Sequence, residues 1–277
     1  MRVSRRLRTS VFGLVLACFA AAPAFGQGLL NNLPDEDGVG VRYEGTYRQL
    51  VKRPNAVEGD TTIQWSRRLR IASVGREEAE YRGQLQPCRW IEFRVQTGRP
   101  KEGDIDAGPG STRIYKVLVP ESAVRGTIDE PIAENRQIFV SYIPIVRGFR
   151  KIGDEPAQPI EPPVLQARPV LTQLHHYRNL MPDGAPGDFQ APAGNFDSQL
   201  YKGSQSAEST TQRSASTAEI YRSDAIPFGL VKWTVKTVVE EKPTTAPRTD
   251  YVITNEITEE MSAFEILNGV DSELITD

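Results

Sequence analysis

The stretch from Thr62 to Ala72, TIQWSRRLRIA, decides the fold class. The apolar side chains occupy one parity: Ile63, Trp65, Leu69 and Ile71. The polar side chains occupy the other parity: Gln64, Ser66, Arg68 and Arg70. Because successive side chains of a strand point to opposite faces, this alternation is typical of an antiparallel strand with one buried face.

The same period-2 alternation recurs along the chain. It is found in residues 42–51, 89–97, 113–119, 230–241 and 251–260, and residues 137–146 are more continuously apolar, as in a strand covered on both faces. Gly and Pro residues within 98–110 predict a long hairpin loop between two of these strands. The pattern predicts a mainly β fold: one curved antiparallel sheet, open-barrel or sandwich-like, within a single domain at residues 40–260.

The last two strands suggest a specific register. Pairing Lys242 with Asp250 sets Lys236 opposite Glu256 and would pair apolar residues on the other face. Opposite charges directly across a strand pair stabilise that pairing, so we predict this register for the hairpin.

Several segments interrupt or follow the β pattern. Residues 153–169 hold five prolines, which predicts an extended polyproline-like segment. Apolar residues at helical spacing predict one amphipathic helix over 170–181. Residues 182–218 are rich in Pro and Gly and then in Ser and Thr, which predicts a mobile low-complexity insertion. Residues 261–277 form a C-terminal segment.

The first 27 residues have the features of an export signal. Four arginines without an acid precede the apolar run 11–22, and Ala24-Phe25-Gly26 offers small residues for cleavage. We therefore expect an exported protein, periplasmic or extracellular. Two alternatives stay open, a lipid anchor at Cys18 and a twin-arginine signal around Arg5-Arg6.

Composition excludes several classes of protein. The whole chain has a formal net charge of −3, and loss of the four signal arginines makes it more acidic, so nucleic acid is not an expected partner. No apolar run is long enough for a transmembrane helix. Cys88 would be the only cysteine of the mature chain, either a buried small hydrophobe or a thiol activated by Arg89.

Motifs for catalysis or metal binding are weak. The two histidines, His175 and His176, are adjacent and would point about 100° apart on a helix, so they do not form a metal pair. Residues 103–110 superficially resemble a phosphate or calcium loop but lack the required residues, and a hairpin tip is the better interpretation. Adjacent carboxylates point to opposite faces of a strand. We predict no catalytic, cofactor-binding or metal-ligating residue.

Aromatic side chains are the remaining candidates for a site. Those that we expect to line an apolar cavity, if they do not simply fill a core, are Trp65, Trp90, Phe93 and Trp233.

The order of elements resembles one known family. The runs RWIEF at 89–93, TRIYKVLV at 112–119 and IPFGLVKW at 226–233 look like those of bacterial exported lipoprotein carriers (LolA-like proteins). The resemblance implies an unclosed antiparallel barrel around a helical lid, with acyl chains held in its concavity. It transfers no binding residue to this chain, and the initial helix of that family has no counterpart here.

These observations favour a non-enzymatic binding or carrier module for an apolar ligand, a lipoprotein or another envelope partner. The alternatives are a structural or adaptor protein of the cell envelope and, third, a hydrolase that uses His175 or His176.

Overall fold

The computed structural model describes residues 33–53, 57–108, 112–123, 129–133, 136–141, 145–160 and 181–275. The strands in these ranges are β1 Gly40–Val51, β2 Thr61–Tyr81, β3 Gln84–Lys101, β4 Asp104–Asp106, β5 Thr112–Pro120, β6 Asp129–Ala133, β7 Arg136–Ser141, β8 Arg147–Ile152, β9 Gln158–Pro159, β10 Met181–Pro182, β11 Gly187–Ala191, β12 Gly194–Glu208, β13 Gln212–Arg222, β14 Leu230–Glu241 and β15 Val252–Leu267. The helical pieces are single 3-10 turns: η1 Glu121–Ala123, η3 Pro227–Gly229 and η4 Arg248–Asp250.

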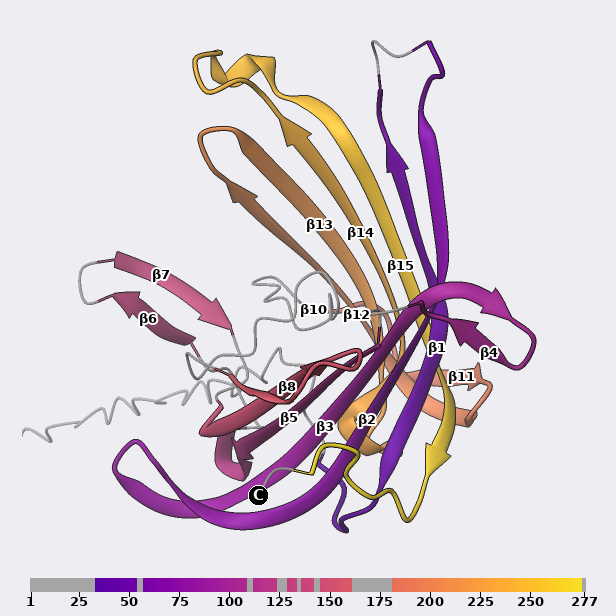
Figure 1. Cartoon of the computed structure of the whole chain (residues 1–277), viewed down its shortest axis with the longest axis vertical. Helices are drawn as coiled ribbons and strands as arrows, with labels where there is room; N and C mark the ends of the chain where they lie inside the picture. The colour runs from indigo at the N-terminus through magenta and orange to yellow at the C-terminus, as the bar shows by residue number, and fades with distance from the viewer. Residues whose placement is uncertain are drawn as a thin grey trace, which may run out of the picture.

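One large antiparallel sheet dominates the molecule (Figure 1). Its strand order is β10-β12-β13-β14-β15-β1-β2-β3-β5-β8-β9, with β11 added to β12 and β4 to β3, and β6 pairs separately with β7. The two outermost strands do not pair, so the sheet is not closed into a barrel. The predicted mainly β, curved antiparallel fold is confirmed.

The core lies on one face of this sheet, which we call the inner face. Alternate residues of the central strands are buried there, and they include Val41, Tyr43, Leu69, Ile71, Ile91, Phe93, Val117, Val231, Trp233, Met261 and Ala263. Ile226 and Phe228 at the η3 turn belong to the same cluster and are fully buried. The Tyr43 hydroxyl donates to the carbonyl of Leu230 at 3.1 Å, and burial raises the pKa of this phenol.

A buried arginine ties the segment before β1 to the sheet. Arg89 is 3% exposed, and its guanidinium donates to the Pro34 carbonyl at 2.9 Å and to the Ser73 hydroxyl at 3.0 Å. The Glu121 carboxylate lies 2.8 Å from the same group. A buried charge is tolerated only when it is paired and hydrogen-bonded, and this one is both.

The Ser/Thr-rich tract differs from the prediction. Residues 202–218, expected to be an irregular insertion, form most of the long β12–β13 hairpin. The prediction was wrong because it considered the tract alone. In the sheet, β13 pairs with the apolar strand β14, and the Ser216 and Thr237 hydroxyls meet at 2.8 Å. Burial contributed by a neighbouring strand thus offsets a weak local pattern.

The predicted register of the last hairpin is wrong by two residues. Lys232 lies opposite Ser262 and Lys236 opposite Thr258, with a β-bulge between Val239 and Glu240. Lys232 nevertheless reaches Glu260 diagonally, at 2.6 Å. Diagonal neighbours are within reach of a long side chain, so charge matching alone did not determine the register.

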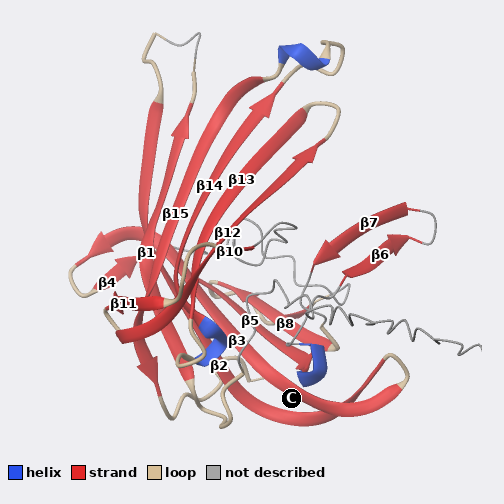
Figure 2. Ribbon diagram, turned by 180° about the vertical axis from the view of Figure 1, so that it is seen from behind, coloured by secondary structure: helices blue, strands red, loops and turns tan. Residues whose placement is uncertain are grey.

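Other predictions fall partly or wholly outside the described ranges. The amphipathic helix over 170–181 is not borne out: its residues before Met181 lie outside, and Met181 itself belongs to β10. Residues 161–169 and the export signal also lie outside. Within the predicted hairpin loop at 98–110, residues 99–106 form the paired β3–β4 hairpin. No helix within the described ranges is long and apolar enough to cross a membrane. Figure 2 shows only short helical turns.

Two glycines allow close approach between backbones. A Cβ placed on Gly45 would lie 1.9 Å from the carbonyl oxygen of Glu260, and one on Gly98 would lie 2.0 Å from that of Asp106. Real side chains do not tolerate such distances, so β15 and β4 can take these positions only because glycine lacks a Cβ.

We predict that Gly45→Ala destabilises the protein by about 3 kcal/mol, because the new methyl group displaces the backbone of β15. The measurement is urea-induced unfolding followed by circular dichroism. Gly187→Ala is the control, since a Cβ at Gly187 meets no atom within 4 Å, and it should change stability by less than about 1 kcal/mol. Equal stabilities for the two variants would contradict the prediction.

Candidate ligand-binding surface

The four aromatic residues predicted to line a cavity do not meet at one place. Phe93 and Trp233 are buried in the inner-face core. Trp90 belongs to the opposite, outer face, where its ring stacks on Phe149 and its Nε1 donates to Glu77 at 3.0 Å. Trp65 lies on the inner face and is 40% exposed. Trp65 and Trp233 therefore remain as neighbours of a possible inner-face site.

A buried ion pair lies on the inner face between these two tryptophans. Arg67 is 5% exposed and Glu259 is 1% exposed, and the guanidinium contacts the carboxylate through Nη1. The Trp233 Nε1 donates to the second oxygen of the same carboxylate at 3.0 Å. The Arg67 Nε donates to the Thr97 hydroxyl at 3.2 Å. These hydrogen bonds compensate the two charges for loss of water.

An aromatic stack continues from this pair toward solvent. The Arg67 guanidinium lies 4.6 Å from the centre of the Tyr47 ring, and Tyr47 stacks on Trp65 at 6.0 Å. Burial raises the pKa of the Tyr47 phenol; Arg67 acts to lower it and Glu259 to raise it. The phenol therefore stays protonated at neutral pH and can donate a hydrogen bond.

The strand ends beyond Arg67 and Glu259 form what we call the open end. Here the hairpins β1–β2, β14–β15 and β12–β13 extend beyond the rest of the sheet (Figure 1), and they stay paired, β1 with β15 as far as Val51 and Asn255 and β13 with β14 as far as Gln212 and Glu241. Inner-face positions continue at two-residue spacing from the core and are only partly buried. Val51, Ile63, Ile257 and Val239 are apolar, and Gln49, Asn255 and Thr237 are polar. Gln49 Nε2 donates to Asn255 at 2.7 Å. The surface is thus amphipathic.

Sequence reasoning missed the Arg67–Glu259 pair, although the sequence contains a signal for it. Arg67 lies on the apolar parity of β2, between Trp65 and Leu69, and Glu259 lies on the parity of Ile257. Both strands pair with β1. β2 and β15 lie on either side of β1, and each carries one charged residue among the apolar residues of its inner face. Because the two charges are opposite, this pattern indicates a buried ion pair.

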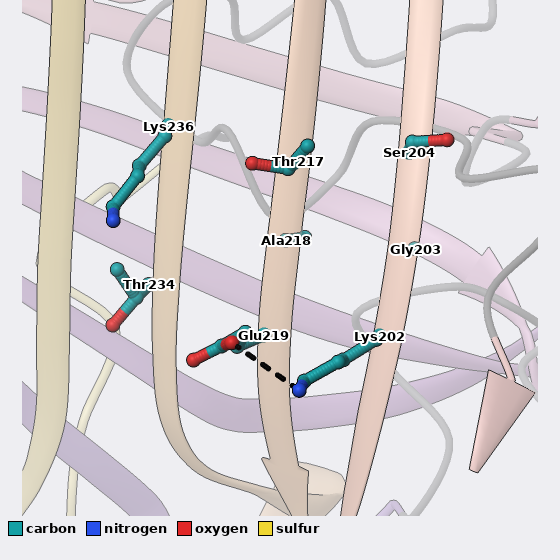
Figure 3. A pocket seen from close by; sticks show the side chains of 8 residues that line it. All are labelled: Lys202, Gly203, Ser204, Thr217, Ala218, Glu219, Thr234 and Lys236. Carbon is teal, nitrogen blue, oxygen red and sulfur yellow. Dashed lines mark ion pairs between the residues drawn. The ribbon is translucent and has the colours of Figure 1, made fainter. Parts of the chain in front are cut away.

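Two pockets that polar side chains line lie on the outer face of the part of the chain that the structure describes. One of about 360 Å³ lies on β12, β13 and β14 (Figure 3), and its lining consists of Lys202, Gly203, Ser204, Thr217, Ala218, Glu219, Thr234 and Lys236. Lys202 contacts Glu219 at 3.7 Å and Asp183 at 2.9 Å, so acidic neighbours already balance its charge. The other pocket, of about 350 Å³, lies beside Arg42, Arg68 and Asp104. Both are charged surfaces rather than apolar cavities.

The described residues do not gather ligands for a metal. No group of three His, Cys, Asp or Glu side chains within these ranges could hold an ion, and His175 and His176 lie outside them. Asp104, within the loop-like stretch 103–110, instead forms an ion pair with Arg68 at 2.8 Å.

Cys88 is a buried thiol rather than an activated one. Cys88 and Arg89 are successive residues of β3, and Arg89 binds Glu121 on the other side of the strand. Burial raises the pKa of the Cys88 thiol, and Glu77 and Glu121 add to this effect. The alternative in which Arg89 lowers this pKa is wrong.

Comparison of the sequence with protein-family models gives no match, and comparison with curated protein sequences gives none either. The interpretation of the site therefore depends on its geometry.

We predict that Glu259→Gln destabilises the protein by about 3 kcal/mol, because it leaves Arg67 buried without its counter-ion. Urea unfolding measures the change. Glu208→Gln is the matched control: Glu208 pairs with Arg248, which is 76% exposed, and its loss should cost less than about 1 kcal/mol. A cost for Glu259→Gln no greater than that of the control would show that the pair is not structural.

We also predict that iodoacetamide does not label Cys88 in the folded protein at pH 8. The raised pKa keeps the thiol protonated and the side chain is buried, so labelling should require unfolding in urea. Mass spectrometry of the alkylated chain provides the measurement. Labelling of the native protein at the rate of a free peptide thiol would contradict this assignment.

Proposed function

We propose that this protein is an exported, non-enzymatic binding module that holds an amphipathic, largely apolar ligand on the inner face of its open end. The observation that carries the proposal is Trp65, a large aromatic side chain left 40% exposed on the face that elsewhere forms the core. Exposed aromatic surface that continues from a core is typical of a ligand-binding surface.

The side chains of the open end suggest the chemistry of the ligand. Ile63, Trp65 and Ile257 offer contact to an apolar chain, and burying such surface is favourable by about 25 cal/mol per Å². The Gln49 and Asn255 amides lie among them and offer hydrogen bonds to a polar group. An amphiphile with one acyl chain and a polar head matches this arrangement.

The buried ion pair supports the proposal by fixing this surface. Arg67 bridges β2 to β15 through Glu259 and holds the Tyr47 ring, on which Trp65 stacks. A ligand that meets a preorganised surface loses less free energy in ordering it.

Two sequence features also support the proposal. The signal-like residues 1–27 favour export, and the resemblance to lipoprotein carriers favours an acyl-chain ligand. If export occurs, the mature protein should lack the signal, and intact-mass measurement of protein recovered from the periplasm or medium tests this directly.

A structural or adaptor role is the second candidate, and the β2–β3 hairpin favours it. Residues 74–88 extend beyond the last residue of β2 that pairs with β1, as the curled hairpin in Figure 1 shows. Leu85 near its tip is 68% exposed. A projecting arm with an exposed apolar residue is suited to a protein partner. This role is supported if the purified protein carries no bound ligand and if Leu85→Asp abolishes co-purification of an envelope partner.

We predict that a fluorescent single-chain amphiphile, 11-dansylaminoundecanoic acid, binds the protein and that Trp65→Ala weakens this binding about tenfold. Removal of the ring deletes apolar contact worth about 1.4 kcal/mol. Fluorescence titration gives the affinity, and native mass spectrometry after mild purification shows whether a natural lipid accompanies the protein.

Phe264→Ala is the matched control. Phe264 is also 40% exposed, but it lies on the outer face beside Arg42. This variant should bind the probe as the wild type does. Equal affinities for the wild type and both variants, or no binding at all by folded protein, would overturn the proposal.

A further inference from the structure

The C-terminal segment 271–275 lies on the outer face after β15 has ended, and it forms no strand there. Glu92 on β3, fully buried, accepts the backbone N–H of Glu273 at 3.2 Å and that of Leu274 at 3.1 Å. It also accepts the Ser272 hydroxyl at 2.9 Å. One carboxylate thus binds three consecutive residues of a segment that bends at Glu273 and Leu274.

Basic side chains bind the other polar groups of this peptide. The Glu273 carboxylate lies 2.7 Å from Arg70 Nη1 and 3.2 Å from Arg94 Nε. Lys116 Nζ donates to the Leu274 carbonyl at 3.1 Å. Leu274 itself is only 3% exposed, although the next residue, Ile275, is 83% exposed. The segment is therefore held through the backbone, one acid and one apolar side chain.

Three arginines lie together in the sheet beneath this peptide, and carboxylates of the sheet already pair with two of them, Glu265 with Arg42 at 2.9 Å and Glu92 with Arg70 at 2.6 Å. Arg42 pairs directly with Arg70, and Arg70 with Arg94, so three like charges lie side by side across β1, β2 and β3. Like charges directly opposite each other are destabilising unless an anion intervenes. The buried Nε atoms of Arg42 and Arg70 donate no hydrogen bond, whereas that of Arg94 lies 3.2 Å from the Glu273 carboxylate. Glu273 supplies an anion between two of them.

We propose that the Arg70–Glu92–Arg94–Lys116 cluster is a peptide-binding site for an acidic segment of a partner protein with the chemistry of Ser-Glu-Leu, and that the tail of this chain is its resident ligand. The site is on the outer face, so it is independent of the ligand proposed for the inner face. Its occupation in cis makes the tail a competitor of the partner segment.

The competition has a definite consequence for affinity. A tethered segment acts at an effective concentration in the millimolar range, so a free peptide of the same sequence should bind the intact chain only weakly. Removing the side-chain contacts of the tail should weaken its hold on the site without altering the site, although its backbone contacts stay.

The experiment uses the full chain and a fluorescein-labelled octapeptide of residues 270–277, VDSELITD. The test variant carries Ser272→Ala, Glu273→Ala and Leu274→Ala together. Fluorescence anisotropy should show that this variant binds the peptide at least tenfold more tightly than the wild type. Adding Glu92→Gln to the same variant should abolish the gain.

A peptide with Lys in place of its Glu, VDSKLITD, is the matched control and should not bind, because it brings a cation to Arg70 and Arg94. Circular dichroism shows whether the triple variant is folded, and the single variant Glu273→Lys replaces it if it is not. The proposal is overturned if the folded variant gains no affinity or if both peptides bind equally. Neither outcome affects the amphiphile titration, which reports on the inner face.

Discussion

A sheet that does not close has to bury one face by curving over itself, and the structure depends on how this is done. Apolar side chains fill the middle of the inner face, from Leu69 and Phe93 to Trp233. At each end of this core lies a buried arginine, Arg67 toward the open end and Arg89 toward the start of the chain. A carboxylate and hydrogen bonds compensate each of these charges. The core therefore ends at a paired arginine, and apolar residues continue beyond it.

The open end follows from this arrangement. Beyond Arg67 and Glu259 the same strand faces continue with partly exposed residues, because β3 pairs with β2 only from Ser66 onward and the rest of the sheet no longer covers these strand ends. Close approach of β15 to Gly45 directs the strands at this boundary. An amphipathic surface is thus a direct extension of the core, whereas the outer face carries paired arginines and acids and holds the polar segment 271–275.

Much of the fold could be predicted from period-2 alternation, as for Thr62 to Ala72, because a half-buried strand imposes that pattern on its own residues. The β12–β13 hairpin could not be predicted, since its burial comes from β14. The prediction of the register of β14 on β15 also failed. The turn already shifts the pairing by one residue, to Glu241 opposite Val252, and the bulge at Val239 adds the second, which the sequence does not encode locally. Of the residues of the candidate site, Trp65 could be predicted because it is a large aromatic residue on a strand. Its partners Arg67 and Glu259 lie on different strands, and only the topology places them together.

The position of β1 affects how the chain acquires its structure. This first strand lies in the interior of the sheet, with β2 on one side and β15, the last strand, on the other, so that Gly40 pairs with Leu267. A chain emerging from the ribosome can form local hairpins early, but it cannot complete the middle of the sheet until β15 has been synthesised. Contacts between residues so far apart in the sequence slow folding. Until β15 pairs with β1, one edge of β1 stays unpaired and is available to chaperones.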